Sequence, residues 1–228
     1  MRLVPAASPE MQAAHSHRYV LTIVDILLQD RNLLRPIARL LKKYHLPAQP
    51  GLEKDLEAIR LNRSRPDATG RVVTYDHVIK LTQILHELYQ QNEKKINYQR
   101  GAIVELLVRK LVCSRYGPGE FCLNNQRFVD GYTSITVEEI DVAALSTVRR
   151  QLEGYECKVS ASGFQQYDCV NLKNLADAAY DKQYRVNVGF VSLENDTLMK
   201  IKLDNYRVPE PIKLYGLDSI ETLQNLLF

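Results

Sequence analysis

The 228-residue chain carries 30 Lys and Arg residues against 27 Asp and Glu, a formal net charge of +3 at pH 7. This length allows one large domain or two smaller ones, each with its own hydrophobic core. The mild positive excess permits a nucleic-acid partner without requiring one. The longest apolar run, Val20 to Leu28, is interrupted by Asp25, and Met1 to His17 lacks the basic and apolar regions of a signal peptide. We therefore expect neither a membrane span nor a secretory signal.

Cysteine and histidine residues lie in different parts of the chain. No CxxC spacing occurs, and no histidine lies near a cysteine in sequence, so the pattern argues against a zinc site. We expect the four thiols to be reduced, which is typical of a cytoplasmic protein. The histidines precede residue 96 and the cysteines follow it: His15, His17, His45, His77 and His86, then Cys113, Cys122, Cys157 and Cys169.

The charge is also divided unevenly, which favours two domains. Residues 1–95 carry 15 Lys and Arg against 10 Asp and Glu, about +5, whereas residues 96–228 carry 15 against 17, about −2. The segment Gln90 to Asn97 is polar apart from Ile96 and is the best candidate for a boundary. We predict a basic, helical, nucleic-acid-binding domain over residues 1–95 and a second domain over residues 96–228.

The first part contains several helical patterns in succession. After a loose lead-in over residues 1–16, apolar residues recur at helical spacing over residues 19–27 and again over 33–44. Pro47, Pro50 and Gly51 end the second helix. A short amphipathic segment follows over residues 52–59, and Tyr75 to Gln91 predicts another helix.

Two basic features of the first part could contact a phosphate backbone. Within residues 33–44, four basic residues at positions i, i+4, i+7 and i+8 share one face of the predicted helix. The arginine-rich stretch Arg60 to Arg71 surrounds Ser64, Pro66 and Gly70 and predicts an exposed basic loop. A solvated surface without a partner is the alternative for both. The predicted nucleic-acid contacts are Arg35, Arg39, Lys42, Lys43, Arg60, Arg63 and Arg65.

The second part changes from a helical to an alternating pattern. A helix is expected from Tyr98 to Tyr116, ended by a Gly-Pro-Gly sequence. Strands are predicted over residues 127–129, 135–142 and 155–159, followed by a helix over 168–182 and a strand over 184–193. Residues 195–196 predict a hairpin turn before a strand over 198–203, and residues 219–227 predict a closing helix. These elements indicate an α/β fold with a mixed central sheet flanked by helices.

Three acidic residues and one lysine can meet at one end of this predicted sheet. Glu105 lies in the apolar helix, Asp141 lies in one strand, and Glu156-Cys157-Lys158 lies in the next. Glu156 and Lys158 are two residues apart on a strand, so they point to one face while Cys157 points to the other. A neighbouring strand can therefore present Asp141 beside Glu156.

Two carboxylates this close repel each other unless a cation lies between them, and oxygen ligands favour Mg²⁺ or Mn²⁺. Such an ion can activate a water molecule and hold a phosphodiester oxygen, while Lys158 stabilises the developing charge. Glu139 is a further candidate acid, and Glu138 is expected to point away. Singly, each residue could belong to a solvated surface, with Glu105 paired to Arg109 along the helix. Together they predict a catalytic site for phosphodiester hydrolysis: Glu105, Asp141, Glu156 and Lys158.

The order of these elements over Tyr98 to Leu193 resembles the PD-(D/E)XK nuclease superfamily, the fold of many restriction endonucleases and archaeal Holliday junction resolvases. The resemblance implies a restriction-endonuclease-like central sheet with a catalytic lysine, here Lys158. Ile140 stands where the name of the motif has proline. The implied metal ligands are Asp141, Glu156 and the backbone carbonyl of Cys157, with Glu105 as a further acid near the same metal.

We therefore predict a nuclease that depends on Mg²⁺ or Mn²⁺, acts on DNA as an endonuclease and uses the helical basic domain to hold its substrate. It is expected to be cytoplasmic and could act as a homodimer. Two alternatives stay open: a non-catalytic nucleic-acid binder on a nuclease-like fold, and a protein-interaction module fused to an α/β domain. The complete set of three acids and one lysine counts against the first alternative.

Overall fold

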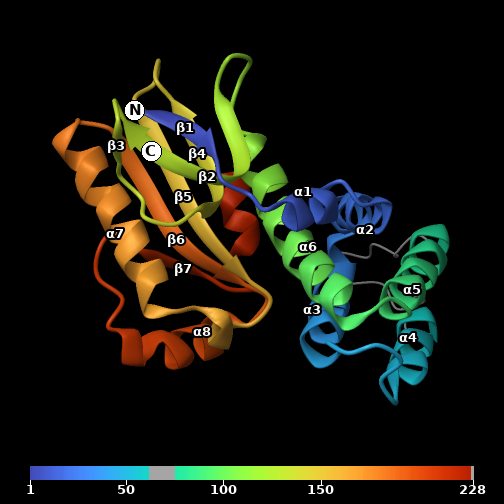
Figure 1. The fold of residues 1–228 in the computed structure, drawn as a ribbon. Coiled ribbons are helices and arrows are strands. Elements are labelled where there is room, and N and C mark those ends of the chain that lie inside the picture. Colours follow the sequence, from blue (N-terminus) through green and yellow to red (C-terminus); the bar gives the residue numbers. More distant parts are fainter. Residues whose placement is uncertain (62–74, 227–228) are drawn as a thin grey trace. The chain divides into compact units, whose positions relative to one another are not determined.

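A computed structural model describes residues 1–61 and 75–226. The chain divides into a sheet unit, residues 1–8 and 104–228, and a helical unit, residues 9–103 (Figure 1). The division falls inside helix α6 (Glu93–Cys113), not in the polar segment at residues 95–96 where we predicted it. The prediction was wrong because the polar segment starts a helix, in which the Asn92 side chain accepts a hydrogen bond from Lys95 N–H at 3.0 Å.

The helical unit forms because apolar residues recur at helical spacing. Its helix α5 packs against α2 and α4. Tyr89 at the end of α5 donates its hydroxyl to the carbonyl of Tyr44 at 3.1 Å, which fixes the chain after α3. None of the helices in the described ranges is long and apolar enough to cross a membrane. The helices of this unit, besides the start of α6, are α1 (Pro9–His15), α2 (Arg18–Gln29), α3 (Leu34–Lys43), α4 (Leu52–Leu61) and α5 (Tyr75–Tyr89).

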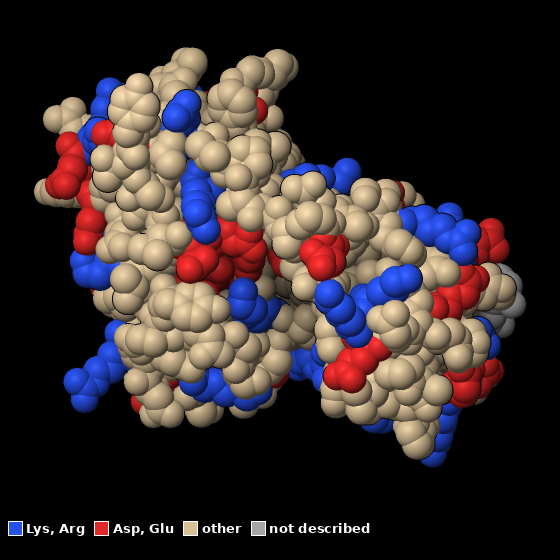
Figure 2. Space-filling model, in the orientation of Figure 1, with Lys and Arg blue, Asp and Glu red and all other residues tan. Residues whose placement is uncertain are grey.

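The basic residues predicted on the second helical segment lie on α3. Arg35, Arg39 and Lys43 are exposed and Lys42 is half-buried. Lys43 forms an ion pair with Asp55 of α4, with 2.7 Å between Nζ and Oδ2. On the face drawn in Figure 2, Lys and Arg side chains are interspersed with Asp and Glu, so this view contains no continuous basic band.

Arg60 does not belong to a loop, as we predicted, but to the last turn of α4. Its Nε donates to the buried Thr82 hydroxyl at 2.9 Å, and its Nη1 lies 3.3 Å from a Glu57 carboxylate oxygen. These contacts hold the guanidinium against the helical unit. Arg63 and Arg65 lie outside the described residues, as does most of the predicted loop.

The sheet unit contains a mixed sheet, as predicted. The strand order is β1-β2-β4-β5-β6-β7, and β3 pairs with β2. Neighbours from β1 to β5 are antiparallel, whereas β5, β6 and β7 are parallel (Figure 1). The strands are β1 (Arg2–Pro5), β2 (Phe121–Asp130), β3 (Thr133–Ser134), β4 (Ile140–Ser146), β5 (Gln151–Lys158), β6 (Arg185–Ser192) and β7 (Lys213–Tyr215).

Helix α7 (Gln166–Asp181) lies along one face of the sheet, against β5 and β6 (Figure 1). Its residues Leu172 and Leu175 are fully buried in the core beneath it. A Cβ added to Gly154 of β5 would lie 2.5 Å from Leu175 Cδ2, so a larger residue at this position would displace the Leu175 side chain. The packing places the first turn of α7 beside the end of β5.

Three further local predictions were wrong. Residues 1–16 are not a loose lead-in, because they contain β1 and α1. Residues 198–203 belong to helix α8 (Asp196–Leu203), since Asn195 caps the helix by accepting from Leu198 N–H at 2.7 Å instead of forming a hairpin turn. The predicted closing helix is a short 3-10 helix over Ile220–Gln224.

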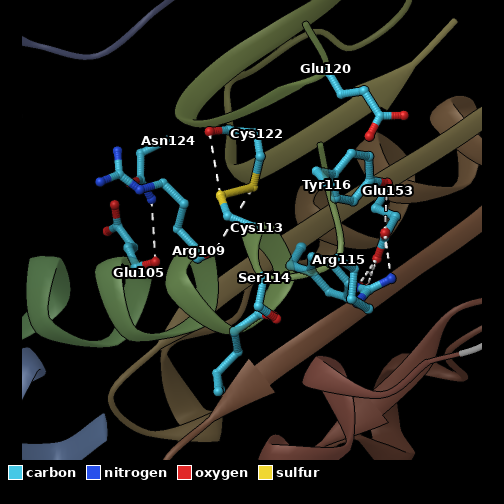
Figure 3. Close-up of a disulfide and its surroundings, with 12 residues drawn as sticks. Glu105, Arg109, Cys113, Ser114, Arg115, Tyr116, Glu120, Cys122, Asn124 and Glu153 are labelled. Carbon is cyan, nitrogen blue, oxygen red and sulfur yellow. Dashed lines mark hydrogen bonds and ion pairs between the residues drawn. A yellow bond between two sulfur atoms is a disulfide. The ribbon is translucent and has the colours of Figure 1, made fainter. Parts of the chain in front are cut away.

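A disulfide joins Cys113 at the end of α6 to Cys122 in β2 (Figure 3). The expectation of four reduced thiols was therefore wrong, although Cys157 and Cys169 are free and buried. The Gly-Pro-Gly turn between α6 and β2 brings the two Cα atoms within 5.6 Å, a separation that suits a disulfide. The cysteine pattern no longer supports the cytoplasmic assignment that rested on it.

The double variant Cys113→Ser/Cys122→Ser is expected to lose roughly 2–3 kcal/mol of unfolding free energy, because the disulfide restricts the unfolded chain. The loss can be measured by denaturant unfolding without reductant. Wild-type protein treated with dithiothreitol should show a similar loss, whereas the double variant should not respond to it. Equal unfolding midpoints for oxidised and reduced wild-type protein would contradict this prediction.

Candidate active site

A cavity of about 630 Å³ lies where β4, β5 and the first turns of α7 come together. Three of the predicted site residues line it: Asp141, Glu156 and Lys158. The sequence pattern placed these three on adjacent strands, and the structure brings them together. The other lining residues come from the segment before β4 and from α7: Val137, Glu138, Glu139, Tyr167, Asp168, Val170 and Asn171.

Asp141 connects the two strands that carry the site. Strand β4 pairs with β5 from Ser146 to Val142, and the next residue of β4, Asp141, contacts β5 through its side chain. Its Oδ2 accepts hydrogen bonds from Cys157 N–H at 2.7 Å and from Lys158 Nζ at 3.0 Å. Asp141 is therefore held in one orientation at the cavity wall.

Glu156 is a buried carboxyl group with an unsatisfied oxygen. The residue is 2% exposed, and its Oε1 has no hydrogen-bond partner among the described residues. Its other oxygen, Oε2, lies 3.8 Å from Lys158 Nζ. Burial raises the pKa of Glu156 well above its ordinary value, and the charge of Asp141 raises it further. A buried oxygen without a partner is costly unless a proton or a cation binds it.

Lys158 provides a positive charge next to the carboxyl groups of Asp141 and Glu156. Burial alone would lower its pKa, but the charges of Asp141, Glu156 and Asp168 together raise the pKa above the ordinary value for lysine. The side chain therefore remains an ammonium group at neutral pH. Its fixed charge beside the cavity can act on a negatively charged ligand.

Two further acidic residues line the cavity: Glu139, which we predicted as a further candidate acid, and Asp168, which we did not predict. Asp168 is buried in the first turn of α7, where its Oδ2 accepts from Gln165 N–H at 2.7 Å as part of a capping box. Burial raises the pKa of Asp168. The pKa of Glu139 is also raised, by burial and then by the charges of Asp141 and Glu105. A Gln-x-x-Asp capping signal at residues 165–168 could have indicated the start of α7.

Asn171 of α7 holds the chain segment before β4. Its Oδ1 accepts from Val137 N–H at 2.9 Å, and its Nδ2 donates to the carbonyls of Glu138 and Glu139 at 3.3 and 3.4 Å. These bonds occupy backbone groups that a continuous strand over 135–142 would use, which is why β4 begins only at Ile140. They also place Glu138 on the cavity wall, contrary to the expectation that it points away.

Glu105 lies near the site but does not line the cavity. It is buried on α6, and its Oε2 accepts from Asn125 Nδ2 at 3.2 Å. The Asn124 amide donates to the carbonyls of Glu105 and Asp141, at 3.3 and 3.0 Å, and so ties α6 to β4. Figure 3 shows Glu105, Arg109 and Asn124 at this junction of helix and sheet.

The cavity wall is strongly acidic, with one lysine among five acids: Glu138, Glu139, Asp141, Glu156 and Asp168. On the face drawn in Figure 2, acidic side chains also gather in a patch on the sheet unit, with basic side chains beside it. Within residues 1–61 and 75–226, no group of three or more His, Cys, Asp or Glu side chains is arranged to hold a metal ion.

Comparisons of the chain with known protein families, with curated proteins and with solved structures find no match.

Proposed function

We propose that the protein is a divalent-metal-dependent nuclease that hydrolyses phosphodiester bonds, with DNA as substrate, in the cavity formed by Asp141, Glu156 and Lys158. The observation that carries this proposal is the buried Glu156 Oε1 without a hydrogen-bond partner, next to the charged Asp141. A hard cation with oxygen ligands satisfies such an oxygen and relieves the repulsion between the two carboxylates.

The residues present suit Mg²⁺ or Mn²⁺. Asp141 and Glu156 would hold the ion, and the backbone carbonyl of Cys157 is the third ligand that the superfamily resemblance implies. Bound water would complete the coordination, as is usual for Mg²⁺. When bound, the ion supplies Lewis acidity, which lowers the pKa of a coordinated water and offsets charge on a phosphate.

Each residue around the proposed ion then has its own role. Asp141, oriented by Cys157 N–H, presents its carboxyl group on the cavity wall. Lys158 presents its ammonium 3.0 Å from Asp141 Oδ2, where it can orient a water molecule or stabilise charge on a phosphodiester oxygen. Asn171 and the Asp168 capping box keep the opposite wall in place. Glu105 supports the α6 side, outside the cavity lining, through its bond with Asn125.

The order of elements supports a restriction-endonuclease-like fold for the sheet unit. Helix α6 precedes β2 and β4, β5 carries Glu156 and Lys158, and α7 leads into the parallel strand β6. The mixed sheet and the acids at the ends of β4 and β5 agree with the resemblance to PD-(D/E)XK nucleases. In the helical unit, the exposed Arg35 and Arg39 of α3 support a role in holding a phosphate backbone.

Incubation with supercoiled plasmid and with single-stranded RNA tests the proposed activity. Each substrate is combined with Mg²⁺, Mn²⁺ or a chelator at low salt. We expect nicked or linear plasmid with either ion and intact plasmid with the chelator. Intact substrates under all these conditions, with correctly folded protein, would refute the nuclease assignment.

Replacing Glu156 by Gln is expected to weaken Mn²⁺ binding by at least about 10-fold, because the variant loses the negative charge of a buried carboxylate ligand. Calorimetric titration measures the affinity. At an Mn²⁺ concentration 100 times the dissociation constant, wild-type protein should gain about 2.7 kcal/mol of stability. Glu138→Gln is the matched control, since Glu138 lines the same cavity but is more exposed. Equal Mn²⁺ affinities for Glu156→Gln and wild-type protein would rule out Glu156 as a ligand.

A further inference from the structure

Tyr167 is an exposed aromatic residue on the wall of the catalytic cavity. It is 57% exposed. It lies in the first turn of α7, directly before Asp168. Its hydroxyl makes no hydrogen bond with other described residues, so its position is set by the helix alone. The capping box of Gln165 and Asp168 fixes that turn and therefore the base of the Tyr167 side chain.

Two exposed valines lie on the same cavity wall. Val170 is 48% exposed and follows Tyr167 by one helical turn, so both occupy the same side of α7. Val137, in the segment held by Asn171, is 68% exposed. We call Val137, Tyr167 and Val170 the apolar rim. Single exposed apolar residues are common, but three around one acidic cavity indicate contact with an apolar part of a ligand.

The charge of the cavity determines which part of a nucleic acid can contact the apolar rim. Glu138, Glu139 and Asp168 lie near the rim and repel phosphate groups. A nucleic-acid strand can place one phosphate group at the cation and at Lys158. Next to the apolar rim, however, it must present its uncharged parts. The uncharged planar part of a nucleotide is the base, and an exposed tyrosine ring is a usual stacking partner for it.

A base can stack on Tyr167 only when one of its faces is accessible. In a continuous duplex, each base lies between its neighbours, and exposing a face requires unstacking that costs a few kcal/mol. A single strand, a loop or a junction offers bases without this cost. The rim therefore discriminates between substrates by their pairing state and not by their sequence.

We propose that Tyr167 stacks on an unpaired base beside the scissile phosphodiester, so that the enzyme prefers single-stranded segments of nucleic acid to continuous duplex. This inference rests on the proposed nuclease function. It adds a substrate class to that function and assigns a binding role to a residue outside the set of acids and lysine.

The test compares Tyr167→Phe, which keeps the ring, with Tyr167→Leu, which keeps an apolar side chain without the ring. Binding is measured in the Lys158→Ala background with Mn²⁺, using a single-stranded oligonucleotide that contains 2-aminopurine. We expect the Phe variant to keep the affinity and the stacking-induced quenching of 2-aminopurine. The Leu variant should bind roughly 5- to 150-fold more weakly and lose the quenching. Equal affinity and quenching in the two variants would overturn the proposal.

Kinetic measurements with otherwise wild-type enzyme separate this inference from the proposed function. Tyr167→Leu should raise KM for a single strand, leave kcat nearly unchanged, and leave cleavage of a continuous duplex unchanged. If wild-type enzyme cleaves both substrates and the Leu variant keeps the wild-type preference, the stacking proposal fails while the nuclease function stands. If no substrate is cleaved, the nuclease function fails, and the quenching experiment still decides whether Tyr167 contacts a base.

Discussion

Replacing Asp141 by Asn is expected to reduce metal-dependent cleavage by at least about 10²- to 10³-fold, the range seen when one preorganised charge interaction is removed from an active site. The asparagine oxygen can still accept from Cys157 N–H, so the connection between β4 and β5 should persist. What the variant loses is the negative charge beside Glu156 and Lys158. Initial rates of plasmid nicking in Mg²⁺, at equal concentrations of folded protein, measure the effect.

Lys158→Ala should show a loss of similar size, because it removes the ammonium that contacts both carboxylates. Lys173→Ala is the matched control, since Lys173 is an exposed lysine of α7 whose ion pair with Asp177 lies outside the cavity. The control should cleave at the wild-type rate. Wild-type rates in both Asp141→Asn and Lys158→Ala would show that cleavage takes place elsewhere or comes from a contaminant.

Replacing Glu153 by Ala is expected to lower the free energy of unfolding by about 3–5 kcal/mol, the usual cost of leaving one charge of a buried ion pair alone. Glu153 of β5 is fully buried and receives two hydrogen bonds from Arg115, at 2.8 and 2.7 Å. The hydroxyl of Tyr116 also donates to it (Figure 3), as does the hydroxyl of Tyr155. Burial raises the pKa of both tyrosines, so they remain neutral donors. Denaturant unfolding measures the loss.

A double variant shows whether the loss comes from the unpaired charge. Arg115→Met combined with Glu153→Leu removes both charges and should be more stable than Glu153→Ala, because no isolated charge stays buried. Glu153→Gln keeps an acceptor for the two tyrosines and should fall between wild type and Glu153→Ala. A Glu153→Ala variant within about 1 kcal/mol of wild type would contradict a structural role for this pair.

The sequence alone was sufficient to predict those residues of the site whose positions follow from the two-residue period of a β-strand. Glu156 and Lys158 share a face because they are two residues apart on β5, and Asp141 lies on the adjacent strand. Asp168 and Asn171 could not be assigned from local patterns. They reach the cavity because α7 crosses β5 at Gly154, and that crossing is a tertiary contact.

Other differences between the predicted and the observed elements arise from contacts between residues far apart in the chain or from caps and turns outside the predicted segment. The residues of β1 pair with residues 126–129 of β2, more than 120 positions away in the chain. Residues 198–203 alternate well enough to suggest a strand, yet the Asn195 cap and the buried Met199 and Leu203, four residues apart, favour a helix. The disulfide depends on a turn that returns the chain from α6 to β2.

The helical unit is an insertion within the sheet unit, because the sheet unit consists of residues 1–8 and of everything from residue 104 onward. During synthesis, β1 leaves the ribosome more than 100 residues before its partner strand β2. The helical unit lies between them and can begin to fold while β1 is still unpaired, since domains generally fold as units during synthesis. Helix α6 then takes part in the folding of both units. Its first half completes the inserted helical unit, and its second half begins the long segment of the sheet unit that carries the candidate site.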